Sequence, residues 1–173
     1  METIKGLKRT NYCGELRIED AGKEVTLFGW CQRQRDLGNL IFIDLRDRTG
    51  LVQLSFNDTT DREVFAKAQS VRAEYVVAAV GTVCERESKT NKIATGDIEI
   101  NVKEFRIISK AETPPFEIAK SEKVGDETTL KYRYLNLRNE KLTQNILMRH
   151  KIAKIAREYF YDNDFIEIET PMR

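Results

Sequence analysis

The chain has 173 residues, of which 40% are apolar and 33% are charged, and its formal net charge is +1. A net charge this small argues against a protein that coats DNA regardless of sequence, and no apolar run is long enough to cross a membrane. The single histidine and the three widely spaced cysteines lack the spacing of zinc ligands, and the odd cysteine count favours reduced thiols in the cytoplasm.

Residues from about 23 to 110 are predicted to form a small β-barrel. Apolar and polar residues alternate in short runs rich in β-formers, and these runs end at turns such as Leu37-Gly38 and Arg48-Thr49-Gly50. A bulge or bend is expected at Gly81. The five predicted strands are 24–33, 39–47, 51–56, 75–85 and 97–102, and the last of them can extend to residue 108.

One helix is predicted between the third and fourth strands. It begins at Thr60, which together with Glu63 has the spacing of a capping box, and apolar residues then recur at helical spacing up to Val71. Three strands, a helix and two strands is the order of the OB-fold, a five-stranded barrel whose second and third strands form an oligonucleotide-binding face. The predicted fold class is therefore mainly β, with an OB-fold barrel as its first domain.

A different pattern follows the barrel. Residues 112–139 are predicted to be a hinge, because Pro114-Pro115 excludes helix there and residues 120–126 are polar. Residues 140–162 then form a long amphipathic helix, and 165–170 alternate as a strand that ends at Pro171. One helix and one strand cannot bury this apolar stripe alone, so it must pack on the barrel, on a second copy or on a further domain.

The second predicted strand carries the candidate nucleic-acid site. Phe42 lies with Asp44 and Arg46 on the face opposite to the apolar residues of that strand. An aromatic ring beside arginines can stack an unpaired base and neutralise its phosphates, although a covering loop or helix would equally explain Phe42. Gln53 interrupts the pattern of the third strand and points to the same side as Ser55; its alternative is a solvated strand residue.

Several segments resemble bacterial-type aspartyl-tRNA synthetases, in order and at compatible spacing. The related asparaginyl and lysyl enzymes share the barrel and its arginine, phenylalanine and glutamine face, whereas the opening around Tyr12-Cys13-Gly14 and the hinge segment favour the aspartyl branch. The resemblance is carried by the sequences at 9–17, 29–30, 33–38, 42–53, 94–100, 130–138 and 165–172. It implies an anticodon-binding OB-fold domain at 1–111, a hinge at 112–139 and the start of a class II catalytic domain at 140–173.

The resemblance also implies a role for each residue of the site. Phe42 would stack on the middle anticodon base, a uridine, and the amide of Gln53 would read its Watson–Crick edge. Arg33 and Arg35 would contact bases and phosphates, and surface ion pairs with Asp36 or Asp44 are their alternative.

Two further residues complete the anticodon site that the resemblance implies. Arg86 would make another anticodon-loop contact, and Glu99 would accept the N1 and N2 hydrogens of guanine unless it is merely solvated. Cys84 stands where some family members have arginine, and Asp164 where the family usually has glycine. Leu37-Gly38 resembles forms restricted to the aspartate tRNA.

For the whole enzyme, the resemblance implies attachment of aspartate to tRNA-Asp with ATP and magnesium, in the cytoplasm. Pro171 is the signature proline of the first class II motif, which builds the homodimer interface, so we expect helix 140–162 to drive self-association. The aspartate pocket and the ATP-binding motifs of the family are absent here. We therefore expect this fragment to bind tRNA-Asp without catalytic residues, metal, cofactor, membrane or DNA. The alternative is a standalone OB-fold module for single-stranded nucleic acid or for protein interaction.

Overall fold

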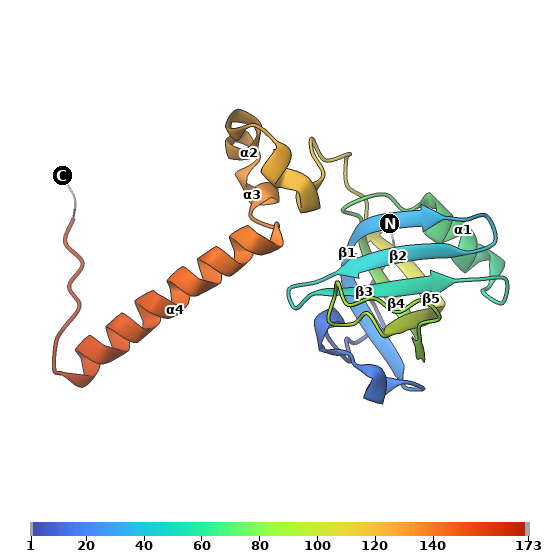
Figure 1. Ribbon diagram of the computed structural model, residues 1–173, viewed down its shortest axis with the longest axis horizontal. Coiled ribbons are helices and arrows are strands. Elements are labelled where there is room, and N and C mark those ends of the chain that lie inside the picture. Colours follow the sequence, from blue (N-terminus) through green and yellow to red (C-terminus); the bar gives the residue numbers. More distant parts are fainter. Residues whose placement is uncertain (1, 172–173) are drawn as a thin grey trace. The chain divides into compact units, whose positions relative to one another are not determined.

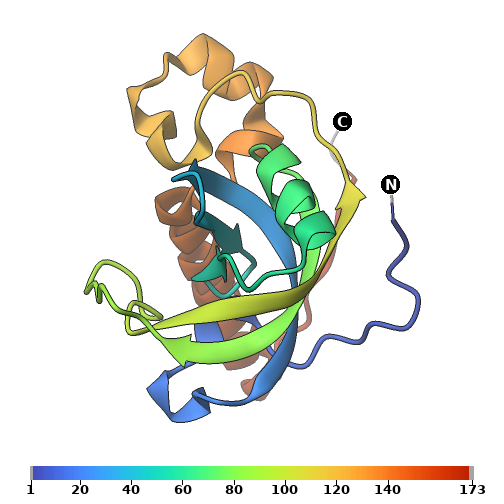
Figure 2. The same cartoon turned by 90° about the vertical axis from the view of Figure 1, so that its right-hand side faces the viewer.

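The structure is a computed structural model that describes residues 2–171, and the chain divides into two compact units, Met1–Pro114 and Pro115–Arg173. The first unit is a closed barrel in the order β1-β2-β3-β5-β4, in which only the β3–β5 pairing is parallel (Figures 1 and 2). The strands are β1 Glu24–Asp36, β2 Ile41–Arg46, β3 Leu51–Phe56, β4 Val76–Glu85 and β5 Ile98–Ser109. The predicted OB-fold is confirmed.

Alternation along the strands fills the barrel. In β2, the predicted inward residues are fully buried, while Phe42, Asp44 and Arg46 remain partly exposed on the outer side. The predicted irregularity at Gly81 is also present, because the β4–β5 register shifts between Val80 and Gly81. A Cβ atom at Gly81 would lie 2.3 Å from the Asn101 carbonyl oxygen, so only glycine allows this close approach.

The helix α1, Arg62–Ser70, lies between β3 and β4 as predicted, but its cap differs from the prediction. Asp61 is the N-cap, and its Oδ1 accepts hydrogen bonds from the amides of Glu63 at 2.8 Å and Val64 at 3.3 Å. The Thr60 hydroxyl instead accepts from the Asn57 amide in the preceding turn. A carboxylate one residue later therefore takes the capping position, and the predicted Thr60–Glu63 box does not form.

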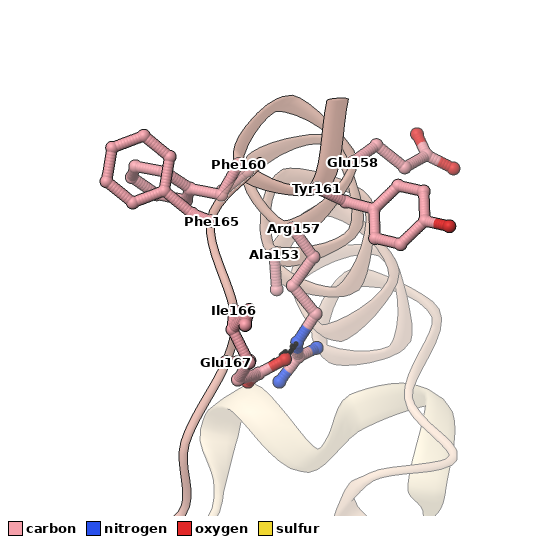
Figure 3. A pocket seen from close by; sticks show the side chains of 9 residues that line it. Ala153, Arg157, Glu158, Phe160, Tyr161, Phe165, Ile166 and Glu167 are labelled. Atoms are coloured by element: carbon pink, nitrogen blue, oxygen red, sulfur yellow. Dashed lines mark hydrogen bonds and ion pairs between the residues drawn. The ribbon is translucent and has the colours of Figure 1, made fainter. Parts of the chain in front are cut away.

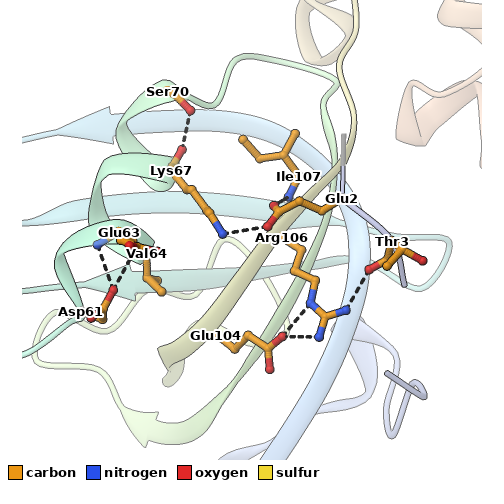
Figure 4. Close-up of polar contacts among 10 residues, drawn as sticks. All are labelled: Glu2, Thr3, Asp61, Glu63, Val64, Lys67, Ser70, Glu104, Arg106 and Ile107. Carbon is orange, nitrogen blue, oxygen red and sulfur yellow. Dashed lines mark hydrogen bonds and ion pairs between the residues drawn. The ribbon is translucent and has the colours of Figure 1, made fainter. Parts of the chain in front are cut away.

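The segment before β1 lies against β5 and α1. The Glu2 amide donates to the Ile107 carbonyl, and the Glu2 carboxylate accepts from the Ile107 amide at 2.8 Å and from Lys67 Nζ at 2.7 Å (Figure 4). Arg106 donates to the carbonyls of Thr3 and Lys5. These contacts give the amino-terminal segment a defined path along the outer side of the barrel.

The same segment then contains two short 3-10 helices, Cys13–Glu15, which contacts the β2–β3 turn, and Ile18–Asp20, which lies near β4. Asp47 in that turn has a side chain only 3% exposed, which accepts from the Cys13 amide at 2.7 Å and from the Thr49 amide and hydroxyl. Burial alone would raise the pKa of Asp47, but these hydrogen bonds outweigh burial and hold the pKa below its ordinary value. Asp47 is thus an anionic anchor between the first residues of the chain and the barrel.

A buried ion pair joins β2 to Glu74, two residues before β4. Arg46 Nη2 donates to both carboxylate oxygens of Glu74, at 2.8 and 3.0 Å, and the two side chains are 13% and 7% exposed. The Glu74 backbone has a φ of 64°, and its amide donates to the Cys31 carbonyl at the irregular point of β1. Glu74 is therefore held both by the ion pair of its side chain and by the hydrogen bond of its backbone amide.

The second unit has three short helices before a long one: η3 Ile118–Lys123, α2 Asp126–Lys131, α3 Arg133–Asn136 and α4 Glu140–Asp162. The segment predicted to be a hinge thus contains helices, and Phe116, Ile118 and Leu135 form a small apolar cluster within it. The bounds of α4 are those predicted for the amphipathic helix. Asn139 caps α4 by accepting from the Lys141 amide.

The predicted strand at 165–170 does not form. A strand needs a hydrogen-bonded neighbour, and no segment within 2–171 pairs with these residues, so they lie beside α4 as irregular chain. Asp164 does take the left-handed conformation expected of the glycine it replaces, with φ 64°. Pro171 is exposed, and Met172, which ends the predicted motif, lies with Arg173 outside the described residues.

In residues 2–171 there is no helix with the length and apolar character needed to cross a membrane. Cys13, Cys31 and Cys84 are all free. Burial raises the pKa of the Cys31 thiol to about 12, so this thiol stays protonated at neutral pH.

Replacing Glu74 by alanine should lower the free energy of unfolding by about 3–5 kcal/mol, because Arg46 would remain buried without its carboxylate. Urea unfolding would measure this loss. The matched control is Glu24→Ala, which removes a carboxylate from the exposed pair with Lys103 and should cost only about 0–1 kcal/mol. Equal losses in the two variants would contradict the structural role given to the Arg46–Glu74 pair.

Replacing Asp47 by asparagine should lower stability by about 1–3 kcal/mol at pH 7 and should also weaken the acid dependence of stability. Because the folded pKa is depressed, the carboxylate stabilises the fold fully above about pH 4, the ordinary pKa of an unfolded aspartate, and this contribution is lost as pH falls through the lower folded value. The gap between parent and variant, measured by urea unfolding, should therefore be constant from pH 7 to 5 and shrink below about pH 4.

Asp58→Asn is the control for Asp47→Asn, because Asp58 is exposed and its carboxylate has no hydrogen-bond partner within the described part of the chain. Its unfolding free energy should follow that of the parent at every pH. A gap for Asp47→Asn that stays unchanged at pH 3 would exclude Asp47 as the titrating anchor.

Candidate nucleic-acid interface

The candidate site lies on the outer side of β1, β2, β3 and β5. The pairing register places Arg35 opposite Phe42, Asp44 opposite Gln53, and Gln53 opposite Glu99. Asp44, Gln53 and Glu99 therefore form one row across the barrel, and Arg35 and Phe42 lie in the neighbouring row of the same face. The two rows together join residues that are up to 64 positions apart in the chain, from Arg35 to Glu99.

Gln53 is the centre of this row and is only 4% exposed. Its Oε1 accepts from Arg35 Nη2 at 2.9 Å and from Arg86 Nη2 at 2.6 Å. Its Nε2 donates to Glu99 Oε2 at 2.7 Å. One amide thus links two guanidinium groups to a carboxylate, and the sequence-based alternative of a solvated Gln53 is wrong.

Arg35 links the amide network to the aromatic ring. Its guanidinium carbon lies 5.4 Å from the centre of the Phe42 ring, and its Nη2 also donates to Asp44 Oδ1 at 3.1 Å. Its Nε is buried without a hydrogen-bond partner within the described residues. Phe42 is partly exposed, and the Arg35 guanidinium lies against its ring. The ion pair between Arg35 and Asp44, which is the alternative that the sequence left open, does form.

The hydrogen-bonding capacity of the network is nearly used up. A glutamine carbonyl oxygen has two lone pairs, and both are taken by arginines in Gln53; one of its two N–H groups is taken by Glu99. A base that is to accept from and donate to this amide must first displace an arginine. The Glu99 Oε1 atom, in contrast, takes part in no hydrogen bond within residues 2–171.

Of the predicted site residues, Arg86 joins the network around Gln53, whereas Arg33 and Pro171 do not. Arg86 begins the β4–β5 loop, where its amide donates to the Asp97 carbonyl at 2.9 Å. Arg33 pairs with Asp44 across the strands but is exposed and makes no hydrogen bond within the described part of the chain. Cys84 lies opposite Glu99 in the β4–β5 register. Pro171 belongs to the second unit and is not part of this face.

The second unit has a hollow of its own, between the last turns of α4 and the chain that follows it (Figure 3). Phe160 and Phe165 contact each other on one side, with ring centres 5.5 Å apart, and Arg157 pairs with Glu167 on the other at 3.2 Å. Its lining is mostly apolar and exposed. It contains no convergent polar groups of the kind seen around Gln53.

Residues 25–108 match a family described as OB-fold nucleic acid binding domain, and residues 125–173 match tRNA synthetases class II (D, K and N). The chain is 51% identical to an aspartate–tRNA ligase of Ruminiclostridium cellulolyticum and 51% identical to an aspartate–tRNA(Asp/Asn) ligase of Caldanaerobacter subterraneus subsp. tengcongensis. Each alignment covers 99% of this chain and 29% of the relative. The structure is also similar to an aspartyl tRNA synthetase from Entamoeba histolytica, with a TM-score of 0.87 and 27% identity over 96% of this chain and 40% of that one.

The barrel, its polar outer face and the two family matches together define a nucleic-acid-binding OB-fold joined to the beginning of a class II tRNA synthetase domain. The chain belongs to the aspartyl-tRNA synthetase family. It spans about 29% of the length of the curated relatives that it matches. The resemblance seen in the sequence is thus confirmed at the level of family and fold.

Proposed function

We propose that this chain reads the anticodon of tRNA-Asp through the outer face of its barrel, as part of an aspartate–tRNA ligase. The observation that carries the proposal is the Gln53 amide, which holds Arg35, Arg86 and Glu99 in one network beside Phe42. Such a face combines an aromatic stacking surface, cations for phosphate and a group with both donor and acceptor. We take aspartate and tRNA-Asp as the amino acid and the RNA because the relatives are aspartate–tRNA ligases.

In this proposal, the middle uridine of the anticodon exchanges with Arg35. The base stacks on Phe42, and its N3–H takes the place of the Arg35 donor at Gln53 Oε1. Asp44 already pairs with Arg35, so the displaced guanidinium keeps an anionic partner while it turns towards a phosphate. Cytosine has no N3–H and would leave the Gln53 oxygen without its second donor, which gives a physical basis for selectivity.

Glu99 reads the guanine of the anticodon in the same proposal. Its free oxygen, together with the oxygen that accepts from Gln53, can take both the N1 and the N2 hydrogens of guanine. Arg33 and Arg86 supply positive charge for the phosphates on either side. Arg33 suits this role because it is exposed and unpaired within the described residues.

For the whole ligase, we propose attachment of aspartate to tRNA-Asp with ATP and magnesium, in the cytoplasm. Residues 2–171 contain no group of three or more histidine, cysteine, aspartate or glutamate side chains able to hold a metal ion, so these residues do not fit the magnesium. ATP and magnesium therefore belong to the proposal for the whole ligase.

We also propose that residues 1–111 are the anticodon-binding domain, 112–139 the hinge, and 140–173 the start of the class II domain. The exposed apolar side chains of α4, among them Ile152 and Ile155, together with the motif that contains Pro171, support a homodimer interface in this last part. Light scattering of the chain at increasing concentration tests this; a monomer at all concentrations would count against it.

Replacing Phe42 by alanine should weaken binding to an anticodon stem-loop with GUC by about 1–3 kcal/mol, because the base loses its stacking surface. Fluorescence titration at two salt concentrations would measure this, beside a stem-loop in which the middle U is changed to C. The parent should prefer GUC at both salt concentrations, and Phe42→Ala should bind both RNAs weakly.

The control variant is Ile18→Ala, which removes a partly exposed apolar side chain away from the outer row and should bind like the parent. Equal binding of the two RNAs by the parent, lost at higher salt, would instead identify a general OB-fold for single strands. Unchanged GUC binding by Phe42→Ala would refute the stacking scheme.

Replacing Glu99 by glutamine should remove most of the preference for guanine over adenine at the first anticodon position, because an amide accepts through one oxygen only. The expected loss is on the order of tenfold. The same titration with an AUC stem-loop measures it. The amide oxygen can still accept from Gln53, so preference for U over C at the middle position should persist and serves as the internal control.

A further inference from the structure

A second group of cations and aromatic rings lies at the other end of β2 from Phe42. The guanidinium carbons of Arg9 and Arg48 lie 4.5 and 4.4 Å from the centre of the Tyr12 ring, and Arg9 also lies 5.6 Å from the centre of the Phe28 ring. None of these four residues belongs to the amide network around Gln53. We call Arg9, Tyr12 and Arg48 the arginine–tyrosine cluster.

Rigid elements hold this cluster in place. Asp47, next to Arg48, accepts from the Cys13 amide, next to Tyr12, so the two cluster segments are fastened together at 2.7 Å. Gly14 packs so tightly on the turn that a Cβ atom there would lie 2.2 Å from the Thr49 carbonyl oxygen. The rings and guanidinium groups are therefore positioned before any ligand arrives.

The positive charge of the cluster is only partly neutralised, because its two arginines share one carboxylate, that of Asp47. Arg48 is exposed and makes no ion pair within the part of the chain that the structure describes. Arg9 Nη1 forms an ion pair with Asp47 at 3.6 Å, and the same carboxylate accepts three shorter hydrogen bonds from Cys13 and Thr49. A guanidinium group that stacks on an aromatic ring still has its N–H donors free at its own edge, and these can bind a phosphate in bidentate fashion.

The cluster continues the face on which the anticodon is proposed to bind. Phe42, Asp44 and Arg46 form the outward row of β2, and the chain turns just beyond this row at Asp47 and Arg48. On β1, Arg35 lies opposite Phe42, and Trp30 lies opposite Arg46, towards the Phe28 end of the strand. Four steps of strand lead from Phe42 to Arg46, about 13 Å, and Arg48 follows two positions later in the turn.

We propose that the arginine–tyrosine cluster is a second RNA contact, which binds backbone phosphates of the strand that continues from the bases read at Phe42. The inference rests on the proposed function, because it takes the RNA placed there as its starting point. Phosphate contacts position an RNA without reading its sequence. The cluster thus sets affinity and register, while the Gln53 network sets base preference.

The test is Arg48→Gln, measured by titration with the GUC and GCC stem-loops over a series of salt concentrations. Affinity for both RNAs should fall by the same factor, about three- to tenfold, and the slope of log affinity against log salt should decrease by about 0.7–0.9 for one lost phosphate. The ratio of GUC to GCC affinity should not change. Arg48→Lys, which keeps a positive charge, should recover most of the slope.

The matched control is Arg62→Gln, which removes an exposed arginine from the first turn of α1. If Arg48→Gln and Arg62→Gln change affinity and slope equally, or if neither differs from the parent, the cluster is not an RNA contact. If the parent shows no preference for GUC while Arg48→Gln still lowers the slope, anticodon reading fails and the phosphate contact stands. Thermal unfolding of each variant verifies that the comparison is made between folded proteins.

Discussion

The parallel pairing of β3 with β5 is the constraint on which the rest of the first unit depends. It closes the barrel, and its register sets Gln53 directly beside Glu99, although 46 residues separate them. Since β3 also pairs with β2, the same residue lies opposite Asp44 and within reach of Arg35. One residue of slip in either register would turn Gln53 or its partners into the apolar interior, so the packed core specifies the polar face as well.

Both lone pairs of the Gln53 oxygen and one of its N–H groups are occupied by residues of the barrel, and this has consequences for recognition. A buried amide with unsatisfied groups would destabilise the barrel, and two arginines and a carboxylate prevent this. A ligand that replaces one of these partners must offer the same donor in the same place, so the cost of a wrong base is an unpaired buried oxygen. Selectivity of this kind depends on the rigidity of the strands and needs no movement of the backbone.

The two units differ in how much of their apolar and charged surface they bury within themselves. The barrel buries its apolar residues, its ion pair at Glu74 and its anchor at Asp47 within residues 2–114. The second unit has only a small cluster around Phe116, and α4 exposes Ile146, Ile152 and Ile155 along with the aromatic residues of its last turn. That contrast agrees with the family matches, in which the first unit is a domain and the second the beginning of one.

The sequence by itself determined the order of the five barrel strands and α1, the outward position of Phe42 and the bounds of α4, because these follow from local periodicity. It did not show the short helices within 115–139. It did not identify Asp61 as the cap of α1, since a threonine and an aspartate in succession offer two candidates and only the turn geometry chooses between them. It predicted a strand at 165–170 that lacks a partner. The saturation of Gln53 and the meeting of Arg9 and Arg48 on Tyr12 were decided by the tertiary structure alone, because contacts between residues far apart in sequence depend on register and closure, which no local pattern encodes.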